Sequence, residues 1–143
     1  MTGTYALAVQ RNGIGRVVAT AGAAVALVGT FLPWLRSGAR RRNSYEIFSL
    51  VERLGFATSS VVGWGLRLWP VVPFLLIGAV TLQWFPRRWV TGGSAIVVVV
   101  YIGGVSVAVE TAPATSLIAV EYGPWVVVVG ILTFAIGALL NRQ

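Results

Sequence analysis

The sequence contains no cysteine, no histidine, no lysine and no aspartate among its 143 residues. These absences exclude disulfides, thiol chemistry, Schiff-base lysines, histidine general bases and metal sites built from histidine or cysteine. Charge is scarce as well, at 10% of residues against 57% hydrophobic. Fifteen charged side chains are too few to cover a soluble domain of this size, so we expect the lipid bilayer to be its solvent. The net charge of +7 does not indicate nucleic-acid binding, because no solvated basic domain carries it.

Four apolar runs are each long enough to form a membrane helix. The first alone covers about 28 Å, close to the thickness of the hydrocarbon core. Pro70 and Pro124 fall in first helical turns, where proline is tolerated, whereas Pro73 lies deeper and could bend the second run. The sequence therefore predicts an all-α membrane protein, a single domain over residues 1–143 folded as a four-transmembrane-helix bundle. The predicted spans are 17–35, 68–85, 89–109 and 123–140.

The orientation of these spans is predicted from the arginines in the short loops. The side with both termini and the second loop carries five arginines, and the side with the long first loop, 36–67, carries six. The counts nearly balance, so we give more weight to the tight arginine turn at 86–88 and to the third loop, 110–122, which lacks arginine. We expect a multi-pass protein of the plasma (inner) membrane with both termini in the cytoplasm.

The first outer loop contains a sequence typical of a short interfacial helix. Asn43 can cap it, and Glu46 stands at the capping-box position three residues on. Tyr45, Phe48 and Val51 share one apolar face of the predicted helix, 44–54, which is too short to span a membrane. This face could cover the protein's own bundle, dock on a partner or lie on lipid.

The remaining polar residues of the outer loops offer contacts rather than catalysis. Arg36, Arg40, Arg41 and Arg42 form a basic cluster that could bind lipid phosphates or carboxylates of a neighbouring subunit. Glu110 and Glu121 are too isolated to predict a metal site or an acid–base pair. The six tryptophans lie near span ends, where an aromatic belt at the membrane interface accounts for them.

Within the spans Tyr101 is the one ionisable side chain, which weakens a transporter interpretation. Small residues recur four apart, a spacing that lets helices approach closely. Such pairs occur on the first, third and fourth spans, and Gly104 on the third is a candidate contact for a partner. Packing within the bundle explains these pairs equally well.

The run from Phe31 to Gly38, Phe-Leu-Pro-Trp-Leu-Arg-Ser-Gly, is followed by the arginines and by Asn43-Ser44-Tyr45-Glu46. Together with the rest of the first span and the first loop, roughly a third of the chain, this run resembles small four-span membrane proteins of actinobacteria, mycobacteria included. The resemblance implies an extracytoplasmic first loop and an accessory role in a large complex, such as an Mce-type lipid importer or the respiratory supercomplex. The layout is also similar to that of claudins, but it lacks their pair of loop cysteines.

These observations favour a non-catalytic accessory subunit of a larger cell-envelope membrane complex, with lipid transport preferred over respiration. The expected partners are larger membrane subunits, permease-like or respiratory, together with lipid headgroups. We expect no enzymatic activity, no catalytic residue, no cofactor and no bound metal. The alternative is a small homo-oligomeric channel or transporter, which should show polar residues along one face of a span.

Overall fold

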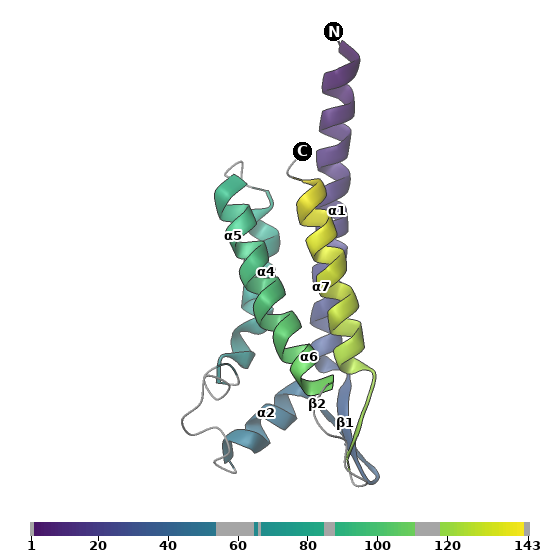
Figure 1. Ribbon diagram of the computed structural model, residues 1–143, viewed down its shortest axis with the longest axis vertical. Coiled ribbons are helices and arrows are strands. Elements are labelled where there is room, and N and C mark those ends of the chain that lie inside the picture. The colour runs from purple at the N-terminus through teal and green to yellow at the C-terminus, as the bar shows by residue number, and fades with distance from the viewer. Residues whose placement is uncertain (1, 54–64, 66, 85–87, 111–117, 142–143) are drawn as a thin grey trace.

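The computed structural model describes the backbone of residues 2–53, 65, 67–84, 88–110 and 118–141, and the side chains of 13–50, 52–53, 65, 67–84, 92–108 and 119–141. Its helical rods run side by side, with both chain ends at one end of the molecule and α2 and the strands at the other (Figure 1). The helices are α1 (Thr2–Phe31), α2 (Ser44–Arg53), the 3₁₀ turn η1 (Trp69–Val71), α4 (Val72–Leu82), α5 (Arg88–Val98), the π-helical segment η2 (Val99–Gly103), α6 (Gly104–Glu110) and α7 (Gly123–Leu140). The strands are β1 (Pro33–Ser37), β2 (Arg40–Asn43) and β3 (Ile118–Val120).

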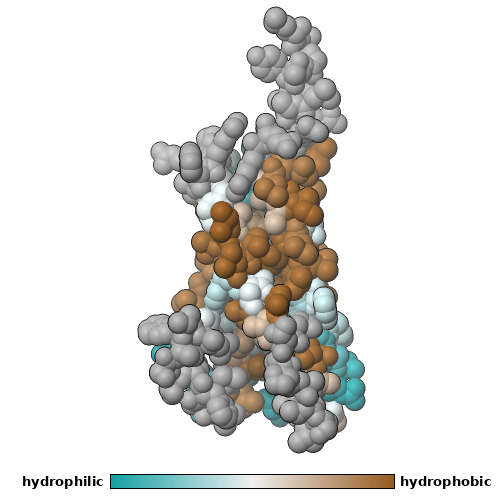
Figure 2. All heavy atoms as spheres, viewed as in Figure 1, coloured by the Kyte–Doolittle hydropathy of each residue, from teal (hydrophilic) through white to brown (hydrophobic). Residues whose placement is uncertain are grey.

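Two of these helices are long and apolar enough to cross a membrane. They are the Gly13–Phe31 part of α1 and the whole of α7. The apolar helical stretches Trp69–Leu82 and Gly92–Ala108 are shorter. Apolar side chains cover the middle of the face seen in Figure 2, whereas polar ones gather at the end that carries the strands. The fold is therefore mainly helical, and the middle of this face is apolar.

The all-α prediction is wrong in one respect, because β1, β2 and β3 form a small antiparallel sheet in the order β2-β1-β3. The first helix ends at Phe31 rather than at residue 35, and the next residues form β1. Pro33 explains the difference, since proline disfavours a helical conformation in the residue before it and cannot donate its own helical hydrogen bond. The hydrophobic run continues through Leu35, so hydropathy alone placed the boundary too late.

Helices lie close to the other three predicted positions, with altered detail. The fourth has the predicted bounds, 123–140, with a proline in its first turn. The second is divided, because Pro70 lies in the 3₁₀ turn η1 and Pro73 lies in the first turn of α4 rather than in a helix interior. The third, which we call the third rod, is one continuous helix formed by α5, η2 and α6, and its π-helical segment η2 contains Tyr101.

The closest packing in the molecule joins α1 to α7, which run antiparallel. Small residues of α1 recur at steps of four and three, and three glycines of α7 recur every seventh residue. A Cβ atom on Gly22 would lie 2.3 Å from the backbone nitrogen of Phe134, and one on Gly130 would lie 2.3 Å from that of Ala26. The two backbones are therefore in direct contact along a seven-residue repeat, the period typical of a coiled coil. The seam comprises Gly15, Ala19, Gly22, Ala26 and Gly29 of α1 with Val127, Gly130, Phe134 and Gly137 of α7.

Candidate functional site

A cluster of buried aromatic rings closes the end of the bundle that carries the strands. Trp34 of β1 and Trp69 of η1 are fully buried, with ring centroids 5.2 Å apart and edge-to-face geometry. Phe48 of α2 packs on both rings, at 4.7 Å from Trp69 and 6.1 Å from Trp34. The predicted interfacial role is wrong for these two tryptophans, because they form the core that holds α2 against the helices. Trp84 and Trp125 are exposed, as an interfacial belt requires.

Trp34 reaches this core because the sheet is irregular beside it. Pro33 pairs with Asn43 and Leu35 pairs with Arg42, so that Trp34 is an extra residue in β1. Such a bulge turns a side chain away from the regular alternation of the strand. The Trp34 indole nitrogen donates to the carbonyl oxygen of Gly29, at 2.9 Å, near the end of α1. Its ring also lies where a side chain at Gly123 would have to go, since a Cβ there would come within 2.3 Å of Trp34 Cδ1.

The polar atoms of this core are joined by a chain of hydrogen bonds. The Trp69 indole nitrogen donates to Ser44 Oγ at 2.9 Å, and Ser44 Oγ donates to the carbonyl oxygen of Thr30 at 2.6 Å. Thr30 Oγ1 donates to the carbonyl oxygen of Leu27, and it shares a hydrogen bond with the Tyr45 hydroxyl. Ser44 thus serves as donor and acceptor at once, and the buried indole of Trp69 has its partner. These bonds connect α1, α2 and η1, so this cluster has a structural role.

The predicted capping box of α2 is confirmed. The Glu46 backbone nitrogen donates to Asn43 Oδ1 at 3.0 Å, and the Asn43 backbone nitrogen donates to Glu46 Oε2 at 3.3 Å. The helix spans Ser44–Arg53, close to the predicted 44–54. Tyr45 and Phe48 face the core, which favours the interpretation that this face covers the protein's own bundle. Val51 lies in the same helix, and its side chain is outside the described residues.

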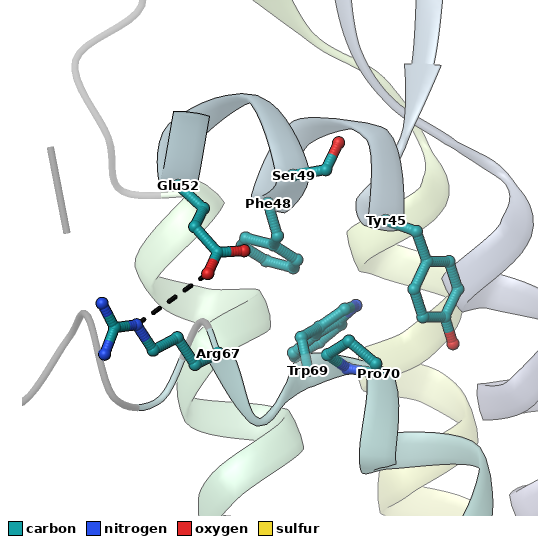
Figure 3. A pocket seen from close by; sticks show the side chains of 7 residues that line it. All are labelled: Tyr45, Phe48, Ser49, Glu52, Arg67, Trp69 and Pro70. Carbon is teal, nitrogen blue, oxygen red and sulfur yellow. Dashed lines mark ion pairs between the residues drawn. The ribbon is translucent and has the colours of Figure 1, made fainter. Parts of the chain in front are cut away.

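Beside the aromatic cluster lies a cleft of about 110 Å³ between α2 and η1 (Figure 3). Phe48 and Trp69 form its apolar floor, and an ion pair between Arg67 Nε and Glu52 Oε1, at 4.0 Å, spans its rim. Sites for drug-sized ligands enclose about 300–1,000 Å³, so this cleft is too small for a substrate of that class. Both rim residues are largely exposed, so the ion pair is worth little to stability.

The arginine cluster lies on a β-hairpin. β1 and β2 are joined at Gly38, whose positive φ of 60° suits the first central position of a two-residue turn. Arg36 stands opposite Arg41 in the register, and Arg41 Nε lies 3.8 Å from Glu121 Oε1. Glu121 follows β3 and is only 17% exposed, so it fixes Arg41 to the sheet from within the same chain. Arg36 and Arg40 are exposed and Arg42 is half-buried.

Gly104 is exposed on α6, and a side chain there would meet nothing within 4 Å, so this residue faces outward as a partner contact requires. A shallow apolar groove of about 270 Å³ lies between the third rod and α7, and three of its lining residues are alanines, Ala95, Ala135 and Ala138. The small residues of α1 serve internal packing instead. The glycines of α1 and α7 recur every seven residues, so the sequence itself indicates the α1–α7 seam, whereas pairs spaced by four do not distinguish this seam from a contact with a partner.

The described residues offer little chemistry. They include no group of three or more carboxylate, histidine or cysteine side chains that could hold a metal. Four hydroxyls in the apolar helices donate to carbonyls four residues back in their own helices rather than to each other; they belong to Thr20, Thr81, Ser106 and Thr133. Glu110 is outside the described side chains, and Glu121 is held by Arg41. The structure thus brings together Arg36, Arg40, Arg41 and Arg42 on the hairpin and Tyr45 with Phe48 beneath it, and it leaves Gly104 apart on α6.

Comparisons of the chain with protein-family models, with curated proteins and with solved structures find no match.

Proposed function

We propose that the chain is a non-catalytic accessory subunit of a larger cell-envelope membrane complex, crossing the plasma membrane four times with both termini in the cytoplasm. The observation that carries this proposal is the contrast between the hydroxyl groups of the helices and the exposed faces of the same helices. Four hydroxyl groups within the apolar helices bond back to their own backbone, whereas the outward faces of these helices are largely apolar. Such a body suits packing against lipid and other helices and has little means for chemistry.

The exposed residues of all four rods support a membrane position. Large apolar side chains are more than half exposed on every rod, a pattern that water would penalise and lipid would favour. The apolar region in the middle of Figure 2 is the visible part of this surface. Examples are Val17 and Val28 on α1, Phe74 and Ile77 on α4, Ile96, Val97 and Val100 on the third rod, and Leu132, Ile136 and Leu139 on α7.

The hydroxyl groups weigh against the channel alternative. A hydrated path needs polar groups free to contact ions or water along one face. Ser106 is fully buried and donates to the carbonyl oxygen of Ile102 at 2.9 Å. Thr133 makes the same kind of bond to Val129 at 2.8 Å. Neither lies along a continuous polar stripe, since the neighbouring exposed positions of α7 are apolar.

The third rod and α7 offer the most suitable face for a partner helix. Gly104 leaves open space on α6, and the adjacent groove is lined by alanine, valine, isoleucine and leucine. Helices associate in lipid through close approach at small residues, because lipid tails are as apolar as the side chains. A neighbouring transmembrane helix would gain packing there that an exposed glycine cannot supply alone.

The preference for lipid transport over respiration rests on the resemblance of the first span and first loop to small four-span membrane proteins of actinobacteria, some of which act as accessory subunits of lipid importers. The residues from Phe31 to Glu46 also have a role in the fold, because they form the β1–β2 hairpin, the capping box and part of the aromatic core. In this proposal the hairpin and α2 stand on the outer side of the membrane, where they meet the extracytoplasmic parts of larger subunits.

The proposal is tested by extracting the tagged chain from its native membrane in a mild detergent and measuring the masses and yields of the subunits that co-purify with it. Gly104→Leu should reduce their yield several-fold, since a leucine fills the space that a partner helix needs. Gly78→Leu is the matched control, because Gly78 is equally open but follows the exposed Ile77 and lies one turn after the exposed Phe74 on α4, where large side chains already hold neighbours away.

Co-purification of stoichiometric subunits with wild type and with Gly78→Leu, and their loss with Gly104→Leu, would support both the accessory role and this face. Loss with both variants would move the partner to another face. Purification of wild type without any partner, at the mass of the chain or a multiple of it, would overturn the proposal in favour of the homo-oligomeric alternative.

A further inference from the structure

The β1–β2 hairpin holds its four arginines away from the helical bundle. β1 leaves the end of α1 and β2 returns, and the pair projects past the ends of α1 and α7 (Figure 1). Ser37 lies six residues beyond Phe31, the last residue of the helix. At about 3.3 Å per residue, an extended chain of this length carries the turn at most about 20 Å past that helix end. The hairpin is also fixed in place, because Glu121 donates its backbone nitrogen to the carbonyl oxygen of Trp34 at 2.9 Å.

This reach exceeds the headgroup layer of the membrane. The polar layer on each side of the hydrocarbon core is about 5–8 Å thick, as the difference between the full bilayer and its core requires. If the apolar surface ends near the exposed ring of Phe31, Arg36 and Arg40 stand beyond the headgroups of the nearest leaflet. Arg42, paired with Leu35 nearer to the bundle, is better placed for a phosphate.

The hairpin holds like charges close together. Arg36 and Arg41 are direct cross-strand neighbours, a pairing that disfavours the sheet unless an opposite charge is near. Glu121 supplies one such charge, to Arg41, at 3.8 Å. For Arg36, Arg40 and Arg42, no ion pair is present among the residues that the structure describes. The four arginines of the hairpin and Glu121 together therefore carry an excess of about three positive charges.

The chain itself cannot neutralise this excess, nor can a second copy of it. It contains four acidic side chains in all. Glu46 serves the capping box, Glu52 pairs with Arg67 and Glu121 pairs with Arg41. Glu110 is the one that remains. Each further copy of the chain would bring seven more positive charges than negative ones, so a different molecule is the better source of carboxylates for these arginines.

We propose that the hairpin, through Arg36, Arg40 and Arg42, binds an acidic segment of a partner protein that stands above the membrane surface. The proposal rests on the accessory role inferred above and names the chemistry of the partner. Guanidinium groups suit this task because each can hold a carboxylate through two parallel hydrogen bonds. Aspartates and glutamates spaced along an extended strand or an exposed helix face would match arginines presented by a rigid β-hairpin.

The absence of lysine from the natural chain gives a direct test. Arg40→Lys places a single lysine at the hairpin tip without changing its charge, and a water-soluble carbodiimide then couples that amine only to a carboxylate in contact with it. The reaction is run on the complex extracted in mild detergent, and the linked peptides are identified by mass spectrometry. Arg53→Lys is the matched control, since Arg53 is an exposed arginine at the end of α2 and lies outside the hairpin.

We expect Arg40→Lys to link to aspartate or glutamate of a co-purifying subunit, and Arg53→Lys to give no such link. A link only to Glu121 or Glu110 of the same chain would overturn the inference. So would equal linking from both lysines, which would indicate chance encounters.

A second pair of variants separates protein from lipid. Arg36→Gln with Arg40→Gln should weaken retention of the partner at least about tenfold, because each lost arginine leaves a carboxylate unpaired. Arg53→Gln with Arg67→Gln removes the same charge from the same end and should retain it. Raising the salt from 0.1 M to 1 M, which shortens the screening length from about 10 Å to about 3 Å, should weaken retention by wild type.

The remaining outcomes are distinct. Loss of co-purifying anionic phospholipid from the hairpin variant, with the partner retained, would assign the arginines to lipid and overturn the inference. Retention of the partner by both double variants would do the same and leave the accessory role intact. If wild type carries no partner, the accessory role itself fails.

Discussion

A methyl group added at Gly22 tests the close contact between α1 and α7. The Cβ of alanine would lie 2.3 Å from the backbone nitrogen of Phe134 and 2.7 Å from the carbonyl oxygen of Gly130. Ordinary contacts between such atoms begin near about 3.5 Å, so the backbones must separate locally by roughly 1 Å. Neither obstacle is the end of a flexible side chain, and therefore the helices themselves must move.

The expected cost follows from the two opposing effects of the change. Overfilling a packed contact costs about 1–3 kcal/mol, and a gap of about 1 Å along the rest of the seam removes up to half of the dispersion energy there. Replacing a helical glycine by alanine returns about 0.5–1 kcal/mol through backbone entropy. We expect Gly22→Ala to be destabilising by about 1–2 kcal/mol, equivalent to a fall in Tm of about 3–6 °C for a chain of this length.

Gly93→Ala is the matched control, because a side chain at Gly93 of α5 would meet nothing within 4 Å. Its Tm should stay the same or rise by about 2 °C through the same entropic gain. Thermal unfolding of both variants, followed by circular dichroism in one detergent, measures the difference. If the two variants shift Tm in the same direction by similar amounts, the seam is not the tight contact described here.

Three further changes test other parts of the fold. Ser44→Ala leaves the buried Trp69 indole without its acceptor and should cost about 1–3 kcal/mol in chemical unfolding, whereas Ser49→Ala, which loses only a bond to its own helical turn, should stay within about 0.5 kcal/mol. Asn43→Ala removes the α2 cap and should cost about 1 kcal/mol by the same measurement; an unchanged midpoint would show that the aromatic packing alone holds the helix. In intact cells an impermeant thiol reagent should label Ala39→Cys at the hairpin turn and spare Gln143→Cys, and since the chain has no native cysteine there is no background; the reverse labelling would invert the orientation.

Local signals in the sequence predicted the helices and the cap of α2 because they act over a few residues. The pair Asn43 and Glu46 specifies a capping box by spacing alone, and the uncharged run after Gly123 specifies α7 with its bounds. Hydropathy failed at Phe31 because Trp34 and Leu35 are as apolar as the helix before them. The decisive factor there was the backbone restriction imposed by Pro33, a cue of chain geometry rather than polarity.

The candidate site was harder to predict because it depends on contacts between distant parts of the chain. Pairing of β3 with β1 brings Glu121 to Arg41 across 80 positions of sequence, and neither residue alone indicates the other. The burial of Trp34 and Trp69 likewise follows from the bulge in β1 and from the placement of Ser44, which no local pattern specifies. The α1–α7 seam differs from these contacts, because the seven-residue spacing of glycines in both helices is visible in the sequence itself.

The most direct test of the accessory role is the mass and composition of the particle that contains this chain when it is extracted gently from its own membrane. Native mass spectrometry distinguishes the 15.2 kDa chain from its multiples and from mixed assemblies. We expect a particle much heavier than the chain, with this protein present at a fixed ratio to other membrane subunits. A particle made only of one or several copies of this chain would contradict the proposed function.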